Sequence, residues 1–205
     1  DRNPHFAVSV AIIENGQPIA GALFNPIKDE MFAAAKGMGA TLNDSPIMAG
    51  GCAEIENCRI VGYPRKFRRL GWPNMQVRIA NSMAYRIALV AANQSDATVA
   101  FTPKSDWDLA AAVLIAEEAG AKITDLQGKQ FQFNAQSTTN NGVICASPAL
   151  HALLETRVKT GSQSKYVKGA APKVLETKMT DHTHSQLLHL VIGGELVDPM
   201  KTEFR

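Results

Sequence analysis

The chain has 205 residues, of which 45% are apolar and 20% are charged, a composition typical of one well-buried globular domain or of a domain and part of another. Its formal net charge of +2 is too small to favour a nucleic acid polymer as the main partner. Charged residues or glycines interrupt the longest apolar runs, so we expect no membrane-spanning segment.

The start of the chain and its cysteines bear on its compartment. The sequence opens with Asp1-Arg2-Asn3-Pro4, without an initiator Met and without the basic and apolar leader of a secreted protein. We therefore expect it to begin inside a longer chain. The three cysteines are odd in number and follow no spacing pattern, which favours reduced thiols in a cytoplasmic protein.

The first third of the chain predicts an antiparallel meander. Residues 6–13 form an almost continuous apolar run, typical of a strand covered on both faces. Asn15-Gly16 then supplies a two-residue turn, and residues 18–24 return antiparallel to the first strand. A third short strand is predicted at 30–35. The glycine-rich stretch 36–40 indicates a tight turn rather than a phosphate site.

The stretch 48–76 is largely irregular and carries a basic run at 65–69. Such a run is usually a solvated face. It also suits an anionic substrate, including one with a second phosphate, and the ring of Tyr63 or Phe67 is available to stack on a base. Both interpretations stay open, and Arg65 is a candidate substrate-binding residue under the second.

A helix is predicted to begin at Asn81-Ser82, with Ser82 as its N-cap. Unpaired N–H groups at a helix start suit a phosphate or hydroxyl ligand, which makes Ser82 and Met83 candidate substrate contacts. Lys104 follows later in the chain. It either faces solvent or meets a phosphate.

A helix with a small-residue face is predicted over 106–120. Four apolar residues recur there at helical spacing: Leu109, Ala112, Val113 and Ala116. Ser105 or Asp106 can serve as the N-cap, and Gly120 suits the left-handed position that ends a helix. Asp108 then lies in the first turn, where it either balances the helix dipole or holds a divalent cation near a phosphate.

This region resembles a known signature. The matching residues are Trp107-Asp108-x-Ala110-Ala111, Glu118-Ala119-Gly120 and Asp125-x-x-Gly128. They resemble the C-terminal signature of the inositol monophosphatase superfamily, Mg-dependent phosphomonoesterases whose W-D aspartate is a metal ligand. The resemblance implies that Asp108 binds Mg²⁺. Asp106 does not match a ligand position and is expected to cap the helix or support the site.

Other stretches resemble the same family, with departures. Residues 36–47 resemble a sheet-edge connection of the family. The family places a Gly before the residues that match Ser82 and Met83, and contacts its substrate there; here the Gly is replaced by Asn81. In inositol-preferring relatives an acidic residue binds a ring hydroxyl at the position of Phe101, which cannot accept that bond.

The resemblance covers about 6–158 and divides the chain into three parts. Residues 1–158 are expected to be the C-terminal half of a phosphatase-like α/β domain, and 159–181 a linker rich in Gly, Ser and Lys. Residues 182–205 weakly resemble the start of a small uncharacterised domain that is found fused to such phosphatases. We therefore expect an α/β fold with a layered mixed sheet and helices, truncated at the N-terminus.

The family's other metal ligands come from a Glu-Glu pair and an Asp-Pro-x-Asp-Gly-Thr motif, both N-terminal to the strand that is predicted here from residue 6. The second motif does not occur in this sequence, and the Glu-Glu pair that does occur, Glu117-Glu118, has the wrong context for the family's pair. The expectation is that the parent protein hydrolyses a small phosphorylated substrate, either inositol monophosphate or a 3′(2′),5′-bisphosphate nucleotide, and that these 205 residues alone are inactive. The alternative is a non-catalytic interaction module or pseudo-enzyme. Family members are often dimers, so a homodimer is a further expectation.

Overall fold

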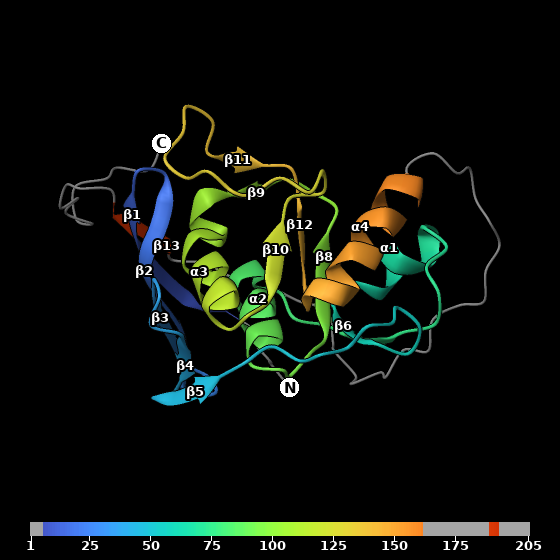
Figure 1. Cartoon of the computed structure of the whole chain (residues 1–205), viewed down its shortest axis with the longest axis horizontal. Helices are drawn as coiled ribbons and strands as arrows, with labels where there is room; N and C mark the ends of the chain where they lie inside the picture. The colour runs from blue at the N-terminus through green and yellow to red at the C-terminus, as the bar shows by residue number, and fades with distance from the viewer. Residues whose placement is uncertain (1–5, 162–188, 193–205) are drawn as a thin grey trace.

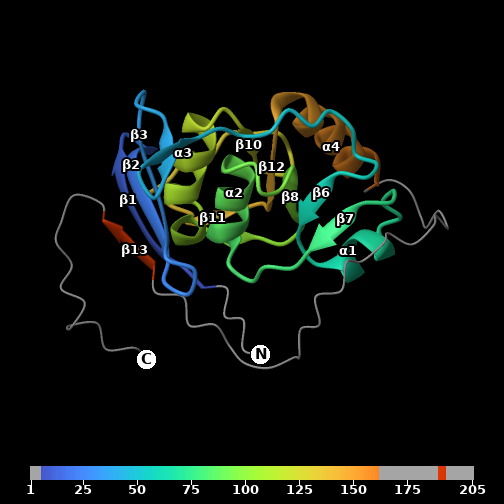
Figure 2. The same ribbon diagram turned by 90° about the horizontal axis from the view of Figure 1, so that it is seen from below.

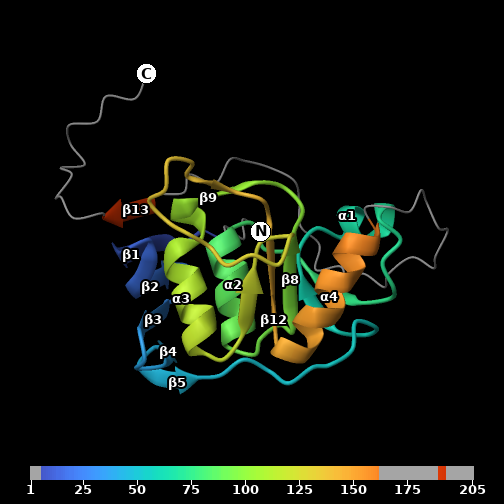
Figure 3. The same ribbon diagram turned by 45° about the horizontal axis from the view of Figure 1, so that its top comes forward.

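The computed structural model describes residues 6–161 and 189–192, in which sheets and helices alternate in layers (Figure 1). The helices are α1 (Pro64–Arg69), α2 (Met83–Ala91), α3 (Ala110–Glu118) and α4 (Pro148–Gly161). Helices α2 and α3 lie between two sheets, and α1 and α4 pack on the far face of the second sheet (Figures 1 and 3). The expected layered α/β fold is confirmed.

The first sheet is the predicted meander. Its consecutive antiparallel strands are β1 (Val8–Glu14), β2 (Gln17–Asn25), β3 (Glu30–Ala35), β4 (Ala40–Leu42) and β5 (Ser45–Ile47). Asn15 and Gly16 both have positive φ, 50° and 78°, as a two-residue hairpin turn of this hand requires. On its other edge, β1 pairs in parallel with β13 (His189–Ile192; Figure 2).

The prediction that both faces of the first strand are covered is wrong for the described structure. Ser9 and Ala11 are buried on the face that meets the helices, whereas Val8 is 37% exposed and Ile12 is 51% exposed on the other face. The run is apolar on both faces, but α2 and α3 cover only one of them. Hydrophobicity alone therefore did not show which layers are present.

The second sheet is mixed and holds the strands that position the candidate site. They are β6 (Arg59–Val61), β7 (Gln76–Arg78), β8 (Ala97–Ala100), β10 (Lys122–Thr124) and β12 (Val143–Ala146), in the order β10-β12-β8-β6-β7. Strands β6, β7 and β8 run parallel, and β12 is antiparallel to both β8 and β10. A short separate ribbon pairs β9 (Lys104–Ser105) with β11 (Thr139–Asn140).

The start of α3 differs from the prediction. A 3₁₀ turn, η1 (Asp106–Asp108), comes first, and α3 begins at Ala110 after Leu109, whose side chain is buried and makes no cap hydrogen bond. The helix is buried all round rather than amphipathic, because sheets lie on both sides of it. Gly120 does end this segment with a positive φ of 80°.

The last helix of the described chain is α4, which begins at Pro148, a residue suited to the first turn of a helix, and ends at Gly161. Apart from 159–161 and the four residues of β13, the predicted linker 159–181 and module 182–205 lie outside the described residues, so that division stays a prediction. None of the helices described is both long and apolar enough to cross a membrane.

Candidate functional site

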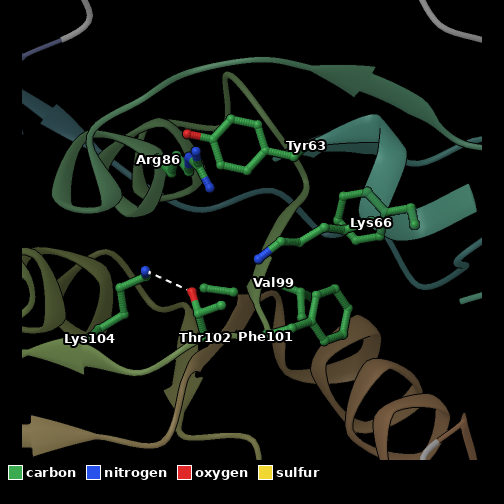
Figure 4. A pocket seen from close by; sticks show the side chains of 9 residues that line it. Tyr63, Lys66, Arg86, Val99, Phe101, Thr102 and Lys104 are labelled. Atoms are coloured by element: carbon green, nitrogen blue, oxygen red, sulfur yellow. Dashed lines mark hydrogen bonds between the residues drawn. The ribbon is translucent and has the colours of Figure 1, made fainter. Parts of the chain in front are cut away.

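A pocket lies where two parallel strands of the second sheet end. Strand β6 stops at Val61 and leads through Gly62 into Tyr63, and β8 stops at Ala100 and leads into Phe101. Carboxyl ends of parallel strands are the usual place for a ligand in α/β sheets. Nine residues line the pocket (Figure 4): Tyr63, Lys66, Phe67, Arg86, Val99, Ala100, Phe101, Thr102 and Lys104.

The apolar side of the pocket is an aromatic cluster. The ring of Phe101 meets Phe67 edge to face at a centroid distance of 5.9 Å and meets Trp72 at 5.8 Å. Phe67 and Trp72 are themselves buried. This packing holds Phe101 in place, at the position where inositol-preferring relatives carry an acidic residue.

The opposite side is formed by Arg86, a buried cation of α2. Arg86 is only 4% exposed. Its Nε donates to the carbonyl oxygen of Ala80 at 2.5 Å, and its guanidinium carbon lies 4.4 Å from the centroid of the Tyr63 ring. Burial lowers the pKa of Arg86, and Tyr63 opposes that shift, but a guanidinium stays protonated at neutral pH.

Two lysines complete the cationic lining. The amino groups of Lys66, on α1, and Lys104, in β9, reach toward the pocket from opposite sides (Figure 4). Lys104 Nζ donates to Thr102 Oγ1 at 3.0 Å. Burial is the largest cause of a lowered pKa of Lys104; Asp108 opposes it, whereas Arg86 and Lys66 add to it. The pocket lining thus holds three cationic side chains and no carboxylate.

Asp108 lies beside this pocket, half-buried at the end of η1, and its charge acts on Lys104. Among the residues that the structure describes, no three His, Cys, Asp or Glu side chains gather as a metal site would need. Mg²⁺ prefers near-octahedral coordination by several oxygens. The described residues therefore do not form a complete Mg²⁺ site on their own.

Asp106 supports the turn that carries Asp108. It is 3% exposed, and its carboxylate accepts hydrogen bonds from the backbone N–H of Asn134 at 3.1 Å and from Asn140 Nδ2 at 2.8 Å. The predicted role as helix cap is wrong, because these more distant partners take up the carboxylate. The expectation that Asp106 supports the site fits this geometry.

The other candidate substrate contacts are not brought together at the pocket. Ser82 is fully buried, and its Oγ caps α2 by accepting from the N–H of Tyr85 at 3.3 Å. Met83 is buried in the core. Arg65 is exposed on α1 and does not line the pocket, whereas its neighbour Lys66 does. Only Lys104 of the four predicted contacts lines it, and substrate binding by any of them stays a prediction.

Two parts of the sequence signature have structural roles. The Glu118 carboxylate accepts from the N–H groups of Gly37 and Gly39 at 2.7 and 2.8 Å, which ties the glycine-rich turn to the end of α3. The carboxylate of Asp125 accepts from the N–H groups of Gln127 and Lys129 in its own turn, at 2.8 and 2.9 Å. Both carboxylates accept hydrogen bonds from backbone N–H groups, and this structural role is enough to explain why these acids are present.

Sequence reasoning missed Arg86, and from the basic run 65–69 it singled out Arg65, whereas Lys66 is the residue of that run that lines the pocket. Arg86 sits inside the predicted helix from 81, where a long cation is normally expected to reach solvent. The available signal was its place among apolar residues on every side, Met83-Ala84-Tyr85 before it and Ile87-Ala88-Leu89 after it. A charged residue in such a run has no exposed face and must be buried with a partner or a ligand.

The structure thus has a layered α/β fold in which a pocket with cationic lining lies beside an acidic turn. Comparisons identify the family: the sequence model of the inositol monophosphatase family matches residues 1–163. The chain belongs to that family.

Individual relatives agree with this assignment. The fructose-1,6-bisphosphatase/inositol-1-monophosphatase of Thermotoga maritima is 32% identical over 148 residues, 69% of this chain and 57% of that protein. The Nus factor SuhB of Xylella fastidiosa is 30% identical over 137 residues, 61% of this chain and 50% of that protein. A crystal structure of the extragenic suppressor protein suhB from Bartonella henselae superposes with a TM-score of 0.65 at 31% identity, covering 76% of this chain and 65% of that one. The chain thus spans between half and two thirds of each of these relatives.

Proposed function

We propose that this chain contributes the anion pocket and one metal ligand to a metal-dependent phosphatase acting on a small phosphate monoester. The observation that supports this most directly is the position of Asp108 beside a pocket lined by Lys66, Arg86 and Lys104. Membership of the inositol monophosphatase family supports phosphatase chemistry in general, and the two candidate substrates remain inositol monophosphate and a 3′(2′),5′-bisphosphate nucleotide.

The chain's own residues would bind and orient the substrate. A phosphate monoester is largely a dianion at neutral pH, and charge-assisted hydrogen bonds from lysine or arginine to phosphate are short and strong. Lys104 is held by Thr102 on one side of the pocket, so it offers a fixed donor close to Asp108. Such positioning accounts for much of the catalysis of phosphoryl transfer.

The metal is part of the proposal. We infer that Mg²⁺ is the ion, that Asp108 is one of its ligands, and that the other carboxylates come from a part of the protein outside these 205 residues. One carboxylate cannot hold a hard cation that needs several oxygens. The family's N-terminal Glu-Glu pair, which Glu117-Glu118 does not match, and its Asp-Pro-x-Asp-Gly-Thr motif would supply the others.

The test is a phosphate-release assay on two polypeptides. One is the 205-residue chain alone, and the other is the same chain with the coding sequence that precedes it in its genome. We expect Mg²⁺-dependent release from the longer polypeptide only. In it, Asp108→Asn should lower kcat by more than about 100-fold, the upper end of the loss seen when only a partner of a metal ligand is removed.

The matched control is Asp44→Asn, which changes the same charge at an exposed turn. It should leave the activity unchanged. Equal turnover by Asp108→Asn and Asp44→Asn would show that Asp108 takes no part in the reaction. Turnover by the 205-residue chain itself would show that the missing motifs are not needed.

The second candidate is a non-catalytic interaction module. Two observations favour it: several relatives carry the name Nus factor SuhB, and the described residues hold no cluster of three metal-ligating side chains. The upstream coding sequence separates the two candidates. Both acidic motifs together with phosphate release support the enzyme, whereas their absence together with no release supports the interaction module.

Cytoplasmic location, a homodimer and the absence of a membrane or nucleic acid polymer partner also remain part of the proposal. They derive from the small net charge, the unpatterned cysteines and the family. Sedimentation of the purified longer polypeptide tests the dimer directly. A single species at the monomer mass across the micromolar range would exclude it.

A further inference from the structure

The pocket holds more positive charge than one phosphate requires. Burial lowers the pKa of Lys104 and the negative charge of Asp108 opposes that shift, so Lys104 is the cation of the pocket that we assign to the phosphate beside Asp108. Lys66 and Arg86 come from different elements, α1 and α2, and line the same hollow. None of the nine lining residues is acidic, so the charges of Lys66 and Arg86 face no carboxylate within the pocket.

Arg86 makes this a built site rather than a basic surface. It is 4% exposed, it is fixed at Nε by the Ala80 carbonyl, and its guanidinium lies against the Tyr63 ring. Keeping a charged group out of water costs several kcal/mol unless it is compensated. A buried guanidinium held in one orientation is well suited to receive a planar or tetrahedral oxyanion with two parallel hydrogen bonds.

We propose that Arg86 and Lys66 form a second anion subsite, so that the preferred substrate carries another phosphate or a carboxylate besides the phosphate that is removed. The inference deepens the proposed function, on which its catalytic part rests. Phe101 adds to it: an aromatic ring packed against Phe67 and Trp72 cannot accept hydrogen bonds from a polyol at that position. The pocket therefore recognises its ligand through charge more than through neutral hydroxyl groups.

The subsite can be tested by binding alone, because all of its residues lie in the 205-residue chain. Calorimetric titration at low ionic strength, without metal, would compare two matched ligand pairs. Fructose 1-phosphate against fructose 1,6-bisphosphate adds a phosphate, and glycerol 2-phosphate against 2-phosphoglycerate adds a carboxylate. We expect the added anion to lower Kd by about 10-fold in at least one pair, and the pair that responds identifies the group.

Variants locate the effect. Arg86→Met and Lys66→Met should each abolish most of the gain from the added anion. Arg86→Lys keeps the positive charge but loses the planar guanidinium, so this variant should retain part of the gain in affinity. Lys129→Met is the matched control, because Lys129 is an exposed lysine outside the basic run 65–69 and does not line the pocket. It should keep the full gain.

The possible outcomes are decisive. No gain in either pair, or an equal gain in Lys66→Met and Lys129→Met, would overturn the subsite. If Arg86→Met does not fold, as judged by circular dichroism, Lys66→Met still decides, because Lys66 is half-buried on a surface helix. If the added anion improves binding but the longer polypeptide releases no phosphate, the subsite stands and the phosphatase proposal is wrong. If the longer polypeptide releases phosphate but the added anion does not improve binding, the phosphatase proposal stands and the subsite is wrong.

Discussion

At the scale of single residues, Asp106 is the side chain that holds the candidate site together. In Asp106→Ala, the Asn134 N–H and the Asn140 amide would lose their common acceptor. Because hydrogen bonds to a charged group stabilise a fold more than neutral ones do, we expect the free energy of unfolding to fall by about 1–3 kcal/mol. Urea unfolding measures it. Asp106→Asn keeps an acceptor oxygen and should lose less; an equal or larger loss would contradict this assignment.

A second residue, His151, makes stability depend on pH. It is fully buried, its Nε2 lies 3.0 Å from Thr124 Oγ1, and burial lowers its pKa from 6.5 to about 4. Between these values the unfolded chain binds a proton that the folded chain does not. The contribution is thus complete above pH 6.5 and is lost as the pH falls toward 4, by an amount on the order of 3 kcal/mol.

Urea unfolding of the wild type and His151→Gln at pH 7 and pH 4.5 tests this. The wild type should lose more stability than the variant on acidification, after the variant's lower starting stability is allowed for. Parallel losses in both proteins would show that other groups carry the acid sensitivity.

The sequence was a better guide to which residues belong to the site than to the partners that those residues contact. Asp108 could be singled out because its neighbours along the chain form the signature. The partners of Asp106 lie 28 and 34 positions away, and the Tyr63 ring that Arg86 packs against lies 23 positions before it, so neither role could be deduced from spacing. Hydrogen bonds between distant segments depend on the assembled fold, which local patterns do not contain.

At the scale of elements, a glycine lets α3 approach β2 closely. A Cβ added at Gly21 would lie 3.0 Å from Ala111 Cα and 3.3 Å from its carbonyl oxygen. These are backbone atoms that cannot turn aside, so Gly21→Ala should cost about 1–3 kcal/mol, as overpacking does.

Gly51→Ala is the control, because a Cβ at Gly51 would meet nothing within 4 Å. It should change the free energy of unfolding by no more than about 0.5 kcal/mol. Thermal or urea unfolding of both variants compares them. If Gly21→Ala were as mild as Gly51→Ala, the sheet and the helix would not be as closely packed as the structure has them.

Element types were largely predictable, and their surroundings were not. The hairpin at Asn15-Gly16 and the small-residue face of α3 follow from local chemistry, namely positive φ and close approach. The start of α3 at Ala110 could not be predicted from the sequence. Asp106 was expected to cap the helix, but its carboxylate accepts hydrogen bonds from Asn134 and Asn140 instead. Helix α1 was missed within a stretch interpreted as irregular, although Pro64 is well suited to a helix start.

At the scale of the whole molecule, the layers explain both what the chain can do and what it lacks. The proposed anion pocket lies at the end of the second sheet and is lined wholly by described residues, so ligand binding to it can be tested on this chain. The outer face of the first sheet keeps Val8, Ile12 and Met31 exposed. Asp108, in the described structure, has no set of acidic neighbours with which to hold a cation.

The central claim is that Asp108 is one oxygen donor of a Mg²⁺ site completed from outside these residues, and calorimetric titration with Mg²⁺ tests it most directly. The account predicts negligible binding to the 205-residue chain, clear binding to the polypeptide extended by its upstream coding sequence, and a large loss of affinity in extended Asp108→Asn but not in extended Asp44→Asn. Unchanged Mg²⁺ affinity in the extended Asp108→Asn variant would contradict it.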